Sequence, residues 1–294
     1  MDFFRSLLSV PGQRQNMIDK AFTLEPDGMM FDLEDAVPPS LKDQAREMVA
    51  AALARPKDPR SKARFVRVNG STTGRTAEDI RAIVHENLEG IVMPKVETVD
   101  EIRAVDTQLT GLEKERRLRA GQIRLLISIE SAKGIRWVDD LVVASTRVMA
   151  VFMGGEDFAL DLGLPVIRTG AGQEQVYARS RVMIAGAMAR IFTVDQGSMD
   201  FRDLDAFRRH VQASRQLGFT TGWCIHPNQI AISNEVFSPT PEEVELSQKV
   251  VAAFDDAKAQ GLGAVMMGGQ FIELPIVERA QRTLRLHEAI RARS

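Results

Sequence analysis

Eight short apolar runs recur along this chain of 294 residues, and most are separated by segments whose apolar residues follow the period of an α-helix. Such runs, rich in β-branched residues, are typical of strands buried on both faces of a parallel sheet. Eight strands alternating with helices predict a (β/α)8 (TIM) barrel, with a doubly wound open sheet as the alternative. The predicted strands are Ser6–Val10, Met29–Leu33, Phe65–Val68, Gly90–Met93, Leu125–Ile129, Val148–Phe152, Arg190–Val194 and Thr221–Ile225.

The seventh run, Arg190–Val194, can also be interpreted as the frayed end of a helix. Residues 1–235 are predicted to form the barrel, and residues 236–294 a C-terminal helical extension. This extension contains a predicted helix at Pro241–Gln260, a glycine-rich apolar loop and a charged helix from Pro275 to about Ala292. A lid or an oligomer-forming arm is the functional interpretation, and a simple cover for the barrel edge is the structural one.

Charge and cysteine content exclude several classes of function. The formal net charge is −2 and no basic stripe is interleaved with aromatic residues, so neither nucleic acid nor an anionic membrane is the expected partner. The single cysteine, Cys224, allows no internal disulfide and no thiolate metal cluster. The acidic N-terminus lacks the features of a signal peptide, and no apolar stretch reaches the length of a membrane span. We therefore expect a cytoplasmic protein.

Two carboxylates each follow an apolar run near the middle of the chain. Glu130 ends the run 124–130 and Asp157 ends the run 148–157, with a helical segment between them. The C-terminal ends of neighbouring parallel strands lie side by side, so the two acids can hold one Mg²⁺ ion. Gly154 and Gly155 allow a ligand to approach the backbone closely. The lack of a nearby His or Cys cluster argues against zinc.

Other charged residues stand at the same predicted strand ends. Asp32, Glu34 and Asp35 follow the second strand and are either a solvated loop or acceptors for metal-bound water. Arg67 lies within the third strand, where burial requires an anionic partner. It can bind a carboxylate or an enolate oxygen of a substrate, or form an internal salt bridge with Asp32 or Glu34.

Lys95 follows Pro94 at the end of the fourth strand. It could be a Schiff-base lysine of a metal-free aldolase, or the charge partner of the acids. We favour the charge partner because a group of carboxylates requires a nearby cation. His226 ends the eighth strand, and a structural role is favoured for it over a catalytic one. Cys224 is interpreted as an inert core residue.

Together these stretches resemble the citrate lyase β-subunit-like branch of the HpcH/HpaI aldolase superfamily. The similarity extends in family order over residues 5 to about 282. It rests on Arg5–Leu8 with Val10–Gly12, Asp32–Val37 with Pro39, Lys42, Ala45 and Arg46, Arg67–Asn69, Met93–Lys95, Ile129–Glu130, Gly154–Asp157 with Leu162 and Gly163, and Gly218–Phe219 with Ile225–Pro227.

The resemblance implies a barrel, trimeric or hexameric, that cleaves or forms a C–C bond in acyl-CoA thioesters. It implies that Glu130 and Asp157 bind Mg²⁺ and that Arg67 binds the keto-acid part of the substrate, with Gly155 and Pro94 as further substrate contacts. It also implies that Glu273, in the C-terminal segment, reaches the site of a neighbouring subunit and acts as the acid or base.

Three positions differ from the pattern of the resembled family. Glu273 stands where relatives carry Asp, Gly222 lies where a Gly-Lys pair is common, and Ser9 replaces an aromatic residue. A side chain longer by one methylene can still transfer a proton, although a displacement of about 1 Å can cost about 10²-fold in rate. Ser9 and Gly222 match positions where relatives contact CoA, so they leave the thioester portion of the substrate open.

The leading functional hypothesis is a Mg²⁺-dependent lyase that cleaves a β-hydroxyacyl-CoA of the citramalyl-CoA or malyl-CoA type. The products would be pyruvate or glyoxylate and an acyl-CoA. One alternative is a CoA-independent 2-keto acid aldolase, whose relatives use an early histidine that residues 1–84 lack. The other is a citrate lyase β-like subunit that acts only with an acyl carrier protein. The long C-terminal segment favours a self-sufficient enzyme over this subunit, because true citrate lyase β subunits are expected to lack much of it.

Overall fold

The computed structural model describes residues 3–57, 62–166, 172–197 and 199–293. The chain divides into two compact units. One comprises Phe4–Asn234, and the other comprises Phe3 together with residues 235–293. Among the described residues, no helix has both the length and the apolar character required to cross a membrane.

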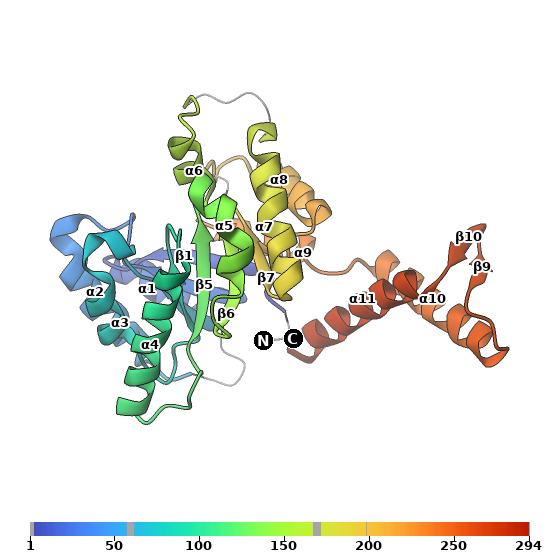
Figure 1. The fold of residues 1–294 in the computed structure, drawn as a ribbon, viewed down its shortest axis with the longest axis horizontal. Coiled ribbons are helices and arrows are strands. Elements are labelled where there is room, and N and C mark those ends of the chain that lie inside the picture. Colours follow the sequence, from blue (N-terminus) through green and yellow to red (C-terminus); the bar gives the residue numbers. More distant parts are fainter. Residues whose placement is uncertain (1–2, 58–61, 167–171, 198, 294) are drawn as a thin grey trace. The chain divides into compact units, whose positions relative to one another are not determined.

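The larger unit is built on eight parallel strands that close into a barrel, each pairing with the next and β8 with β1 (Figure 1). Closure pairs Ser6 with Gly222 and Leu8 with Cys224. The predicted (β/α)8 barrel is confirmed, and the seventh run is a strand. The strands are β1 (Ser6–Pro11), β2 (Gly28–Asp32), β3 (Ala63–Arg67), β4 (Gly90–Met93), β5 (Arg124–Ile129), β6 (Val148–Met153), β7 (Phe192–Asp195) and β8 (Thr221–Cys224).

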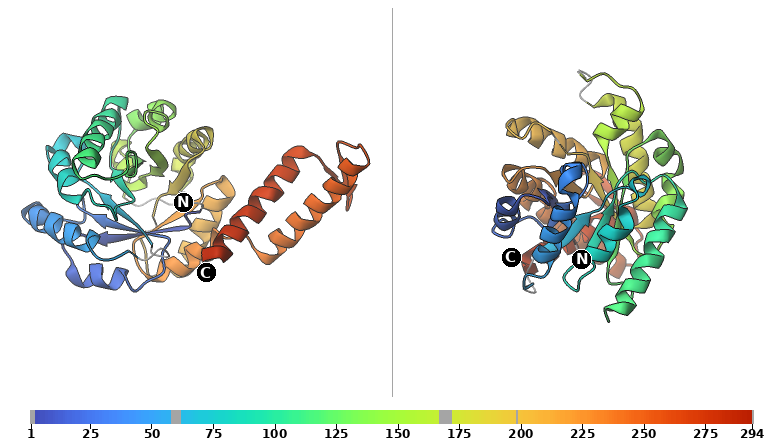
Figure 2. Two further views of the ribbon diagram at one scale, coloured as in Figure 1. Left: turned by 90° about the horizontal axis from the view of Figure 1, so that it is seen from below. Right: turned by 90° about the vertical axis from the view of Figure 1, so that its left-hand side faces the viewer.

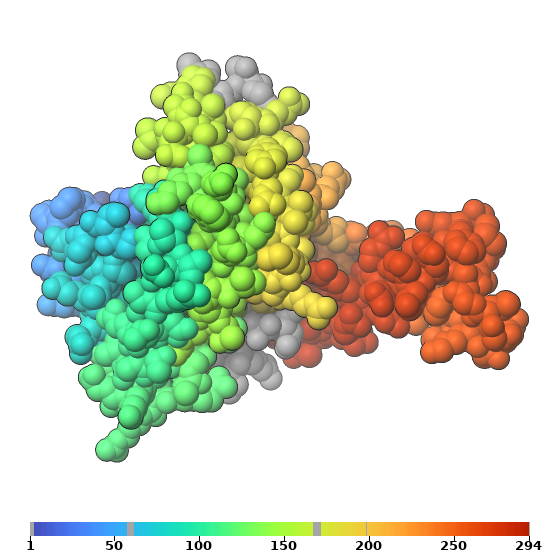
Figure 3. All heavy atoms as spheres, in the orientation of Figure 1, coloured from blue at the N-terminus to red at the C-terminus, as the bar shows by residue number. Residues whose placement is uncertain are grey.

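The helices of this unit surround the strands (Figure 2). On the face shown in Figure 3, helices α4, α5 and α7 lie side by side over the sheet. The sequence analysis did not predict the short helices α1, α6 and α9, because one or two turns carry too few residues for a period to be visible. The helices are α1 (Gln15–Ala21), α2 (Lys42–Leu53), α3 (Thr76–Ile83), α4 (Val99–Glu115), α5 (Ala132–Val142), α6 (Gly155–Asp161), α7 (Val176–Ala189), α8 (Leu204–Leu217) and α9 (Asn228–Val236).

The barrel interior is apolar in its lower part and charged at its C-terminal end. Alternate residues of a strand point to the same side, so Arg67 follows Phe65 into the interior one layer higher. Gly28 leaves room for this packing, because a Cβ there would lie 2.8 Å from the Phe4 ring and 2.9 Å from the Phe65 ring. The apolar cluster comprises Phe4, Leu7, Met30, Ala63, Phe65, Val92, Leu126, Ala150, Phe152 and Val194.

The C-terminal unit consists of two helices joined by a β-hairpin. Helix α10 (Pro241–Ala259) begins with a reciprocal cap in which Thr240 Oγ1 accepts from the Glu243 amide and Glu243 Oε2 accepts from the Thr240 amide. The strands β9 (Val265–Met267) and β10 (Gln270–Ile272) and the helix α11 (Leu274–Arg293) follow.

The predicted loop of this unit is therefore partly a hairpin. Its turn is formed by Gly268 and Gly269, with φ values of 58° and 82° that favour glycine. Val250, Ile272, Val277 and Ala280 form the core between the helices and the hairpin. Two strands of three residues are too short to show alternation in the sequence. The role of this unit as a lid or oligomer-forming arm stays a prediction.

The packing around Gly28 predicts the effect of adding a methyl group there. Gly28→Ala should lower the free energy of unfolding by about 1–3 kcal/mol, because the rings of Phe4 and Phe65 must move. The matched control is Gly111→Ala in α4, where a Cβ meets nothing within 4 Å and the change should stabilise the helix by about 0.5–1 kcal/mol. Urea denaturation measures both, and equal effects of the two substitutions would contradict the packing argument.

Candidate active site

The charged residues predicted from the sequence converge at the C-terminal ends of the barrel strands. Asp32 and Arg67 end β2 and β3, Lys95 follows β4, and Glu130 follows β5. Asp157 is a correction to the prediction, because β6 stops at Met153 and Asp157 lies in the first turn of the short helix α6. Gly154 and Gly155 break the strand and start this helix, which turns the side chain of Asp157 toward the site.

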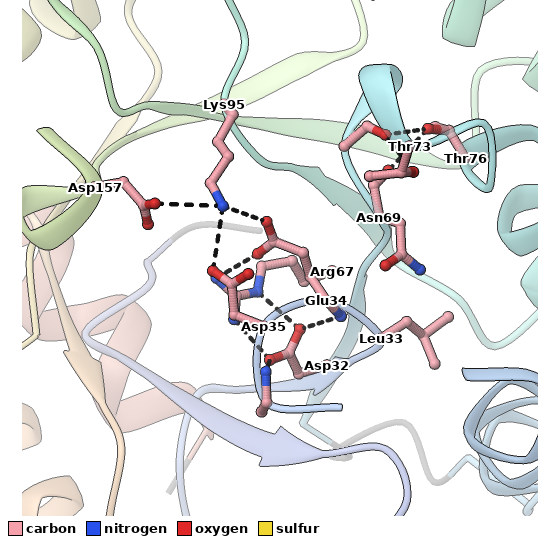
Figure 4. Close-up of polar contacts among 12 residues, drawn as sticks. Asp32, Leu33, Glu34, Asp35, Arg67, Asn69, Thr73, Thr76, Lys95 and Asp157 are labelled. Carbon is pink, nitrogen blue, oxygen red and sulfur yellow. Dashed lines mark hydrogen bonds and ion pairs between the residues drawn. The ribbon is translucent and has the colours of Figure 1, made fainter. Parts of the chain in front are cut away.

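Arg67 forms a buried ion pair with two of the acids (Figure 4). Its Nε and Nη2 donate to the two oxygens of Asp32 at 2.8 and 2.6 Å, and its Nη1 lies 2.9 Å from Glu34 Oε2. Burial alone would raise the pKa of Asp32, but the charge of Arg67 and its hydrogen bonds outweigh burial and lower that pKa. The internal salt bridge is therefore present, and it fixes the direction of the guanidinium fork.

Lys95 lies between three carboxylates, and Figure 4 shows its side chain extended toward them. Its Nζ is 3.0 Å from Glu34 Oε1, 3.3 Å from Asp157 Oδ1 and 3.4 Å from Asp35 Oδ2. Burial opposes the charge, yet Glu34, Asp35 and Asp157 raise the pKa of Lys95 above its ordinary value. A Schiff-base lysine requires a lowered pKa, so this geometry favours the charge-partner interpretation.

No cationic side chain among the described residues forms an ion pair with Glu130. Its side chain is almost fully buried, and among the described residues Oε2 has no hydrogen-bond partner. Burial is the main reason that its pKa is raised to about 7, with Glu34 and Asp157 adding to the shift, while Ser128 and Arg67 oppose it. A carboxylate held in this way can be stabilised by a cation supplied from outside the chain.

The two glycines of the site are required by its packing. A Cβ on Gly154 would lie 2.4 Å from Glu130 Cγ, and a Cβ on Gly155 would lie 1.3 Å from Gln196 Oε1. Gln175 also donates to the Gly155 carbonyl at 2.8 Å. Gly154 therefore leaves space for Glu130, and Gly155 leaves space for Gln196.

A cavity of about 410 Å³ opens between these residues. Among the predicted residues, Pro94 lies instead in a small separate pocket beside Asn69 and Gly70. Glu273 belongs to the C-terminal unit, where it is exposed between β10 and α11, and its catalytic role stays a prediction. The residues that line the cavity are Ser9, Pro11, Asp32, Asp35, Ala36, Arg67, Glu130, Gly154, Gly155, Glu156, Asp157, Gln196, Gly197, Met199, Trp223 and Ile225.

The donor set of this cavity suits a hard cation. Within the described ranges, no group of three or more His, Cys, Asp or Glu side chains is arranged to hold a metal. Mg²⁺ is commonly held by one or two carboxylates, with water and substrate oxygens completing its shell. Glu130, with its Oε2 unpartnered among the described residues, and Asp157 both line this cavity and fit this requirement.

Comparison with known proteins decides the family. The sequence model for the family described as HpcH/HpaI aldolase/citrate lyase matches residues 5–227. The chain belongs to this family. Its HpcH/HpaI relatives include citrate lyase subunit beta of Leuconostoc mesenteroides subsp. cremoris, 36% identical over 97% of this chain and 93% of that protein. The L-malyl-CoA/beta-methylmalyl-CoA lyase of Cereibacter sphaeroides is 32% identical over 98% of this chain and 96% of that protein.

The fold of this HpcH/HpaI protein is also found in CitE of Mycobacterium tuberculosis, whose crystal structure contains magnesium, acetoacetate and coenzyme A. The TM-score is 0.80 at 23% identity, over 97% of this chain and 98% of that chain. The match to the Leuconostoc β subunit corrects one argument from the sequence. Since that subunit covers nearly the whole chain, a long C-terminal segment does not separate a free lyase from a citrate lyase subunit.

Asp195, Gln196 and Trp223 contribute to the site of this HpcH/HpaI protein but were not predicted from the sequence. Asp195 ends β7 and binds Arg179 through both oxygens, and its Oδ1 accepts from the Gln196 amide at 2.9 Å. This buried pair positions the segment of Gln196 that lines the cavity. Like Asp32, Asp195 is an acid at the end of a strand, which is the pattern that identified the other site residues. It was not recognised because the seventh run could also be interpreted as a helix end. Trp223, with its ring 5.7 Å from the Arg67 guanidinium carbon, lies within the predicted strand Thr221–Ile225 and was not singled out.

The raised pKa of Glu130 predicts a cost in stability. The folded protein keeps the Glu130 proton up to about pH 7 while the unfolded chain loses it near pH 4.5, so stability falls as the pH rises through this interval. In metal-free buffer at pH 8, Glu130→Gln should therefore increase the free energy of unfolding by about 1–3 kcal/mol, with a smaller gain at pH 5. Urea denaturation at the two pH values measures the difference.

The control for this prediction is a buried glutamate with a cation in contact. Glu113 lies 2.8 and 2.7 Å from the two terminal nitrogens of Arg147, and Glu113→Gln should destabilise the protein by roughly 3 kcal/mol. Destabilisation by Glu130→Gln at pH 8 as large as that by Glu113→Gln would show that Glu130 is satisfied in the folded state.

Proposed function

We propose that this HpcH/HpaI protein is a Mg²⁺-dependent C–C lyase. Its substrate would be a β-hydroxyacyl-CoA of the malyl-CoA or citramalyl-CoA type, and its products a 2-keto acid and an acyl-CoA. The observation that carries the proposal is the buried Glu130, whose Oε2 has no hydrogen-bond partner among the described residues and which lines the same cavity as Asp157 and Arg67. The malyl-CoA lyase relative supports the thioester substrate. The M. tuberculosis structure shows that this fold can hold magnesium, a keto acid and CoA together.

In the proposed site, Glu130 and Asp157 hold the cation. When bound, a divalent cation would polarise the substrate oxygens as a Lewis acid and orient the substrate for cleavage. Glu130 can serve this role at neutral pH because its pKa of about 7 leaves a large fraction ionised, and an adjacent cation favours the charged form further.

Arg67 is proposed to bind the keto-acid end of the substrate. Two of its nitrogens are held by Asp32, so the guanidinium keeps one orientation and needs no reorganisation when charge develops. In the cleavage direction the substrate hydroxyl loses its proton and the Cα–Cβ bond breaks to give the keto acid. The electron pair passes to the thioester enolate, which takes up a proton to give the acyl-CoA.

Glu273 is proposed to deliver that proton. This role is proposed for a homo-oligomer, trimeric or hexameric, in which the C-terminal segment of one subunit reaches the site of another. The Glu273 side chain is exposed, which is compatible with such a use.

The metal assignment predicts the effect of neutral isosteres. Glu130→Gln and Asp157→Asn should each lower kcat/KM for thioester cleavage by at least about 10³-fold, because each removes a cation ligand that acts on developing charge. Asp161→Asn is the matched control, since Asp161 is an acid of the same helix, α6, that does not line the cavity. Release of the keto acid is followed with and without EDTA, and full activity of the wild type in EDTA would exclude the metal.

A panel of substrates separates the proposed lyase from its alternatives. Malyl-CoA and citramalyl-CoA are compared with free hydroxy-keto acids and with citryl thioester on an acyl carrier protein, all read out as keto-acid release. We expect turnover of the CoA esters at least about 10²-fold above the others. Activity on free hydroxy-keto acids would favour the CoA-independent aldolase. Activity only with the carrier protein would favour the citrate lyase subunit, which the 36% identical relative supports.

A further inference from the structure

The acids around the cavity share few positive charges. Arg67 is committed to Asp32 and Glu34 through three of its nitrogens and is nearly buried. In the part of the chain that the structure describes, Lys95 is the cation that forms an ion pair with Asp157, at 3.3 Å. One of the two proposed metal ligands is therefore already bound by a positive side chain of the protein itself.

We propose that Lys95 is an internal counter-cation that competes with the divalent metal for Asp157. In the metal-free protein its ammonium neutralises Asp157 together with Glu34 and Asp35, and it gives up Asp157 when the cation binds. The inference rests on the proposed metal site at Glu130 and Asp157. It assigns to Lys95 a role that weakens metal binding.

The backbone conformation of Lys95 directs its side chain toward these three carboxylates. Lys95 has φ 53°, in the left-handed region that is unfavourable for a residue with a Cβ. The next residue is fixed, because the Val96 amide donates to the Ser128 carbonyl at 3.0 Å. This conformation turns the lysine away from the path of β4 and toward the loop after β2 and the helix α6, where its three partners lie (Figure 4).

Lys95 also differs from Arg67 in its freedom to move. The Lys95 side chain is 42% exposed and that of Arg67 is 10% exposed. A lysine ammonium is a point charge on a flexible stem, whereas the arginine fork here is held at several atoms. Lys95 can therefore leave Asp157 and keep Glu34 and Asp35, while Arg67 stays in place.

Electrostatics gives the sign of the effect. A divalent ion on Asp157 would lie within a few ångströms of the ammonium, and like charges at that distance repel even where solvent screens them. Removal of the charge also leaves Glu34, Asp35 and Asp157 without their shared cation. Both effects raise the affinity for Mg²⁺. The loss of the shared cation also destabilises the metal-free protein.

The test is a calorimetric titration of the purified protein with Mg²⁺, without substrate. Lys95→Met should bind Mg²⁺ at least about tenfold more tightly than the wild type, whereas Lys95→Arg, which keeps the charge, should stay within about threefold. Lys95→Gly removes the same charge and suits φ 53°, so it should reproduce the tighter binding even if methionine impairs folding. The matched control Lys133→Met removes an exposed lysine that pairs with Glu97 and does not line the cavity, and it should leave the affinity unchanged.

A second measurement is the melting temperature. In EDTA the uncharged variants should melt below the wild type, and Mg²⁺ should raise their Tm by more than it raises that of the wild type. Unchanged or weaker Mg²⁺ binding by Lys95→Met and Lys95→Gly would overturn the inference while leaving the proposed metal site intact. A wild type that binds no Mg²⁺, or binding that Glu130→Gln does not reduce, would overturn the metal site and the Lys95 role together.

Discussion

The buried ion pair of Arg67 with Asp32 and Glu34 is the interaction on which the site depends. An arginine inside a barrel is tolerated only when its charge and its N–H groups are satisfied. Asp32, at the end of β2, and Glu34, in the loop that follows, do this. The other oxygen of Glu34 contacts Lys95, and Lys95 in turn contacts Asp157. One chain of alternating charges therefore links β2, β3, β4 and α6 and sets the shape of the polar end of the barrel.

The same chain of charges explains why the pKa values of two buried carboxyl groups shift in opposite directions. Asp32 is fully buried, yet the charge and hydrogen bonds of Arg67 overcome the effect of burial and lower its pKa. Glu130 is buried to a similar degree without such a contact, and its pKa rises to about 7. Pairs of titratable groups whose surroundings separate their pKa values are typical of catalytic sites. Here the satisfied acid orients the arginine, and the unsatisfied acid is available to a ligand.

Much of this arrangement could be predicted because burial leaves a strong pattern in the sequence. The eight strands are apolar runs of four to six residues, and each acid at a strand end marks the rim of the barrel, so the residues of the site could be named without coordinates. The pattern fails where the elements are short. Helix α6 (Gly155–Asp161) is too short to show a helical period, so Asp157 was assigned to the end of the strand before it. The hairpin strands β9 and β10 have three residues each and were not predicted.

Side-chain pairing was the other quantity that the sequence could not decide. An arginine in the third strand is compatible both with binding a substrate and with an internal salt bridge, so the sequence could not choose between these two roles. The distances from Arg67 to Asp32 and Glu34 show that the salt bridge is present. Asp32 reaches Arg67 because the two residues occupy paired positions of β2 and β3, and Glu34 follows in the loop after β2. Such registry depends on the closed barrel as a whole.

The lining of this cavity varies in its physical character. Arg67, Glu130 and Asp157 place charged groups in it, and the direction of Arg67 is fixed by its buried ion pair with Asp32. On the side of β1 and β8, Ser9 and Trp223 line the wall, and Gly222, beside Trp223, carries no charge. Shape rather than charge decides what fits there, because a serine hydroxyl and an indole present volume and one or two hydrogen-bonding atoms. Substitution of Ser9 therefore changes the shape of this wall without removing a charge or an ion pair of the network around Arg67.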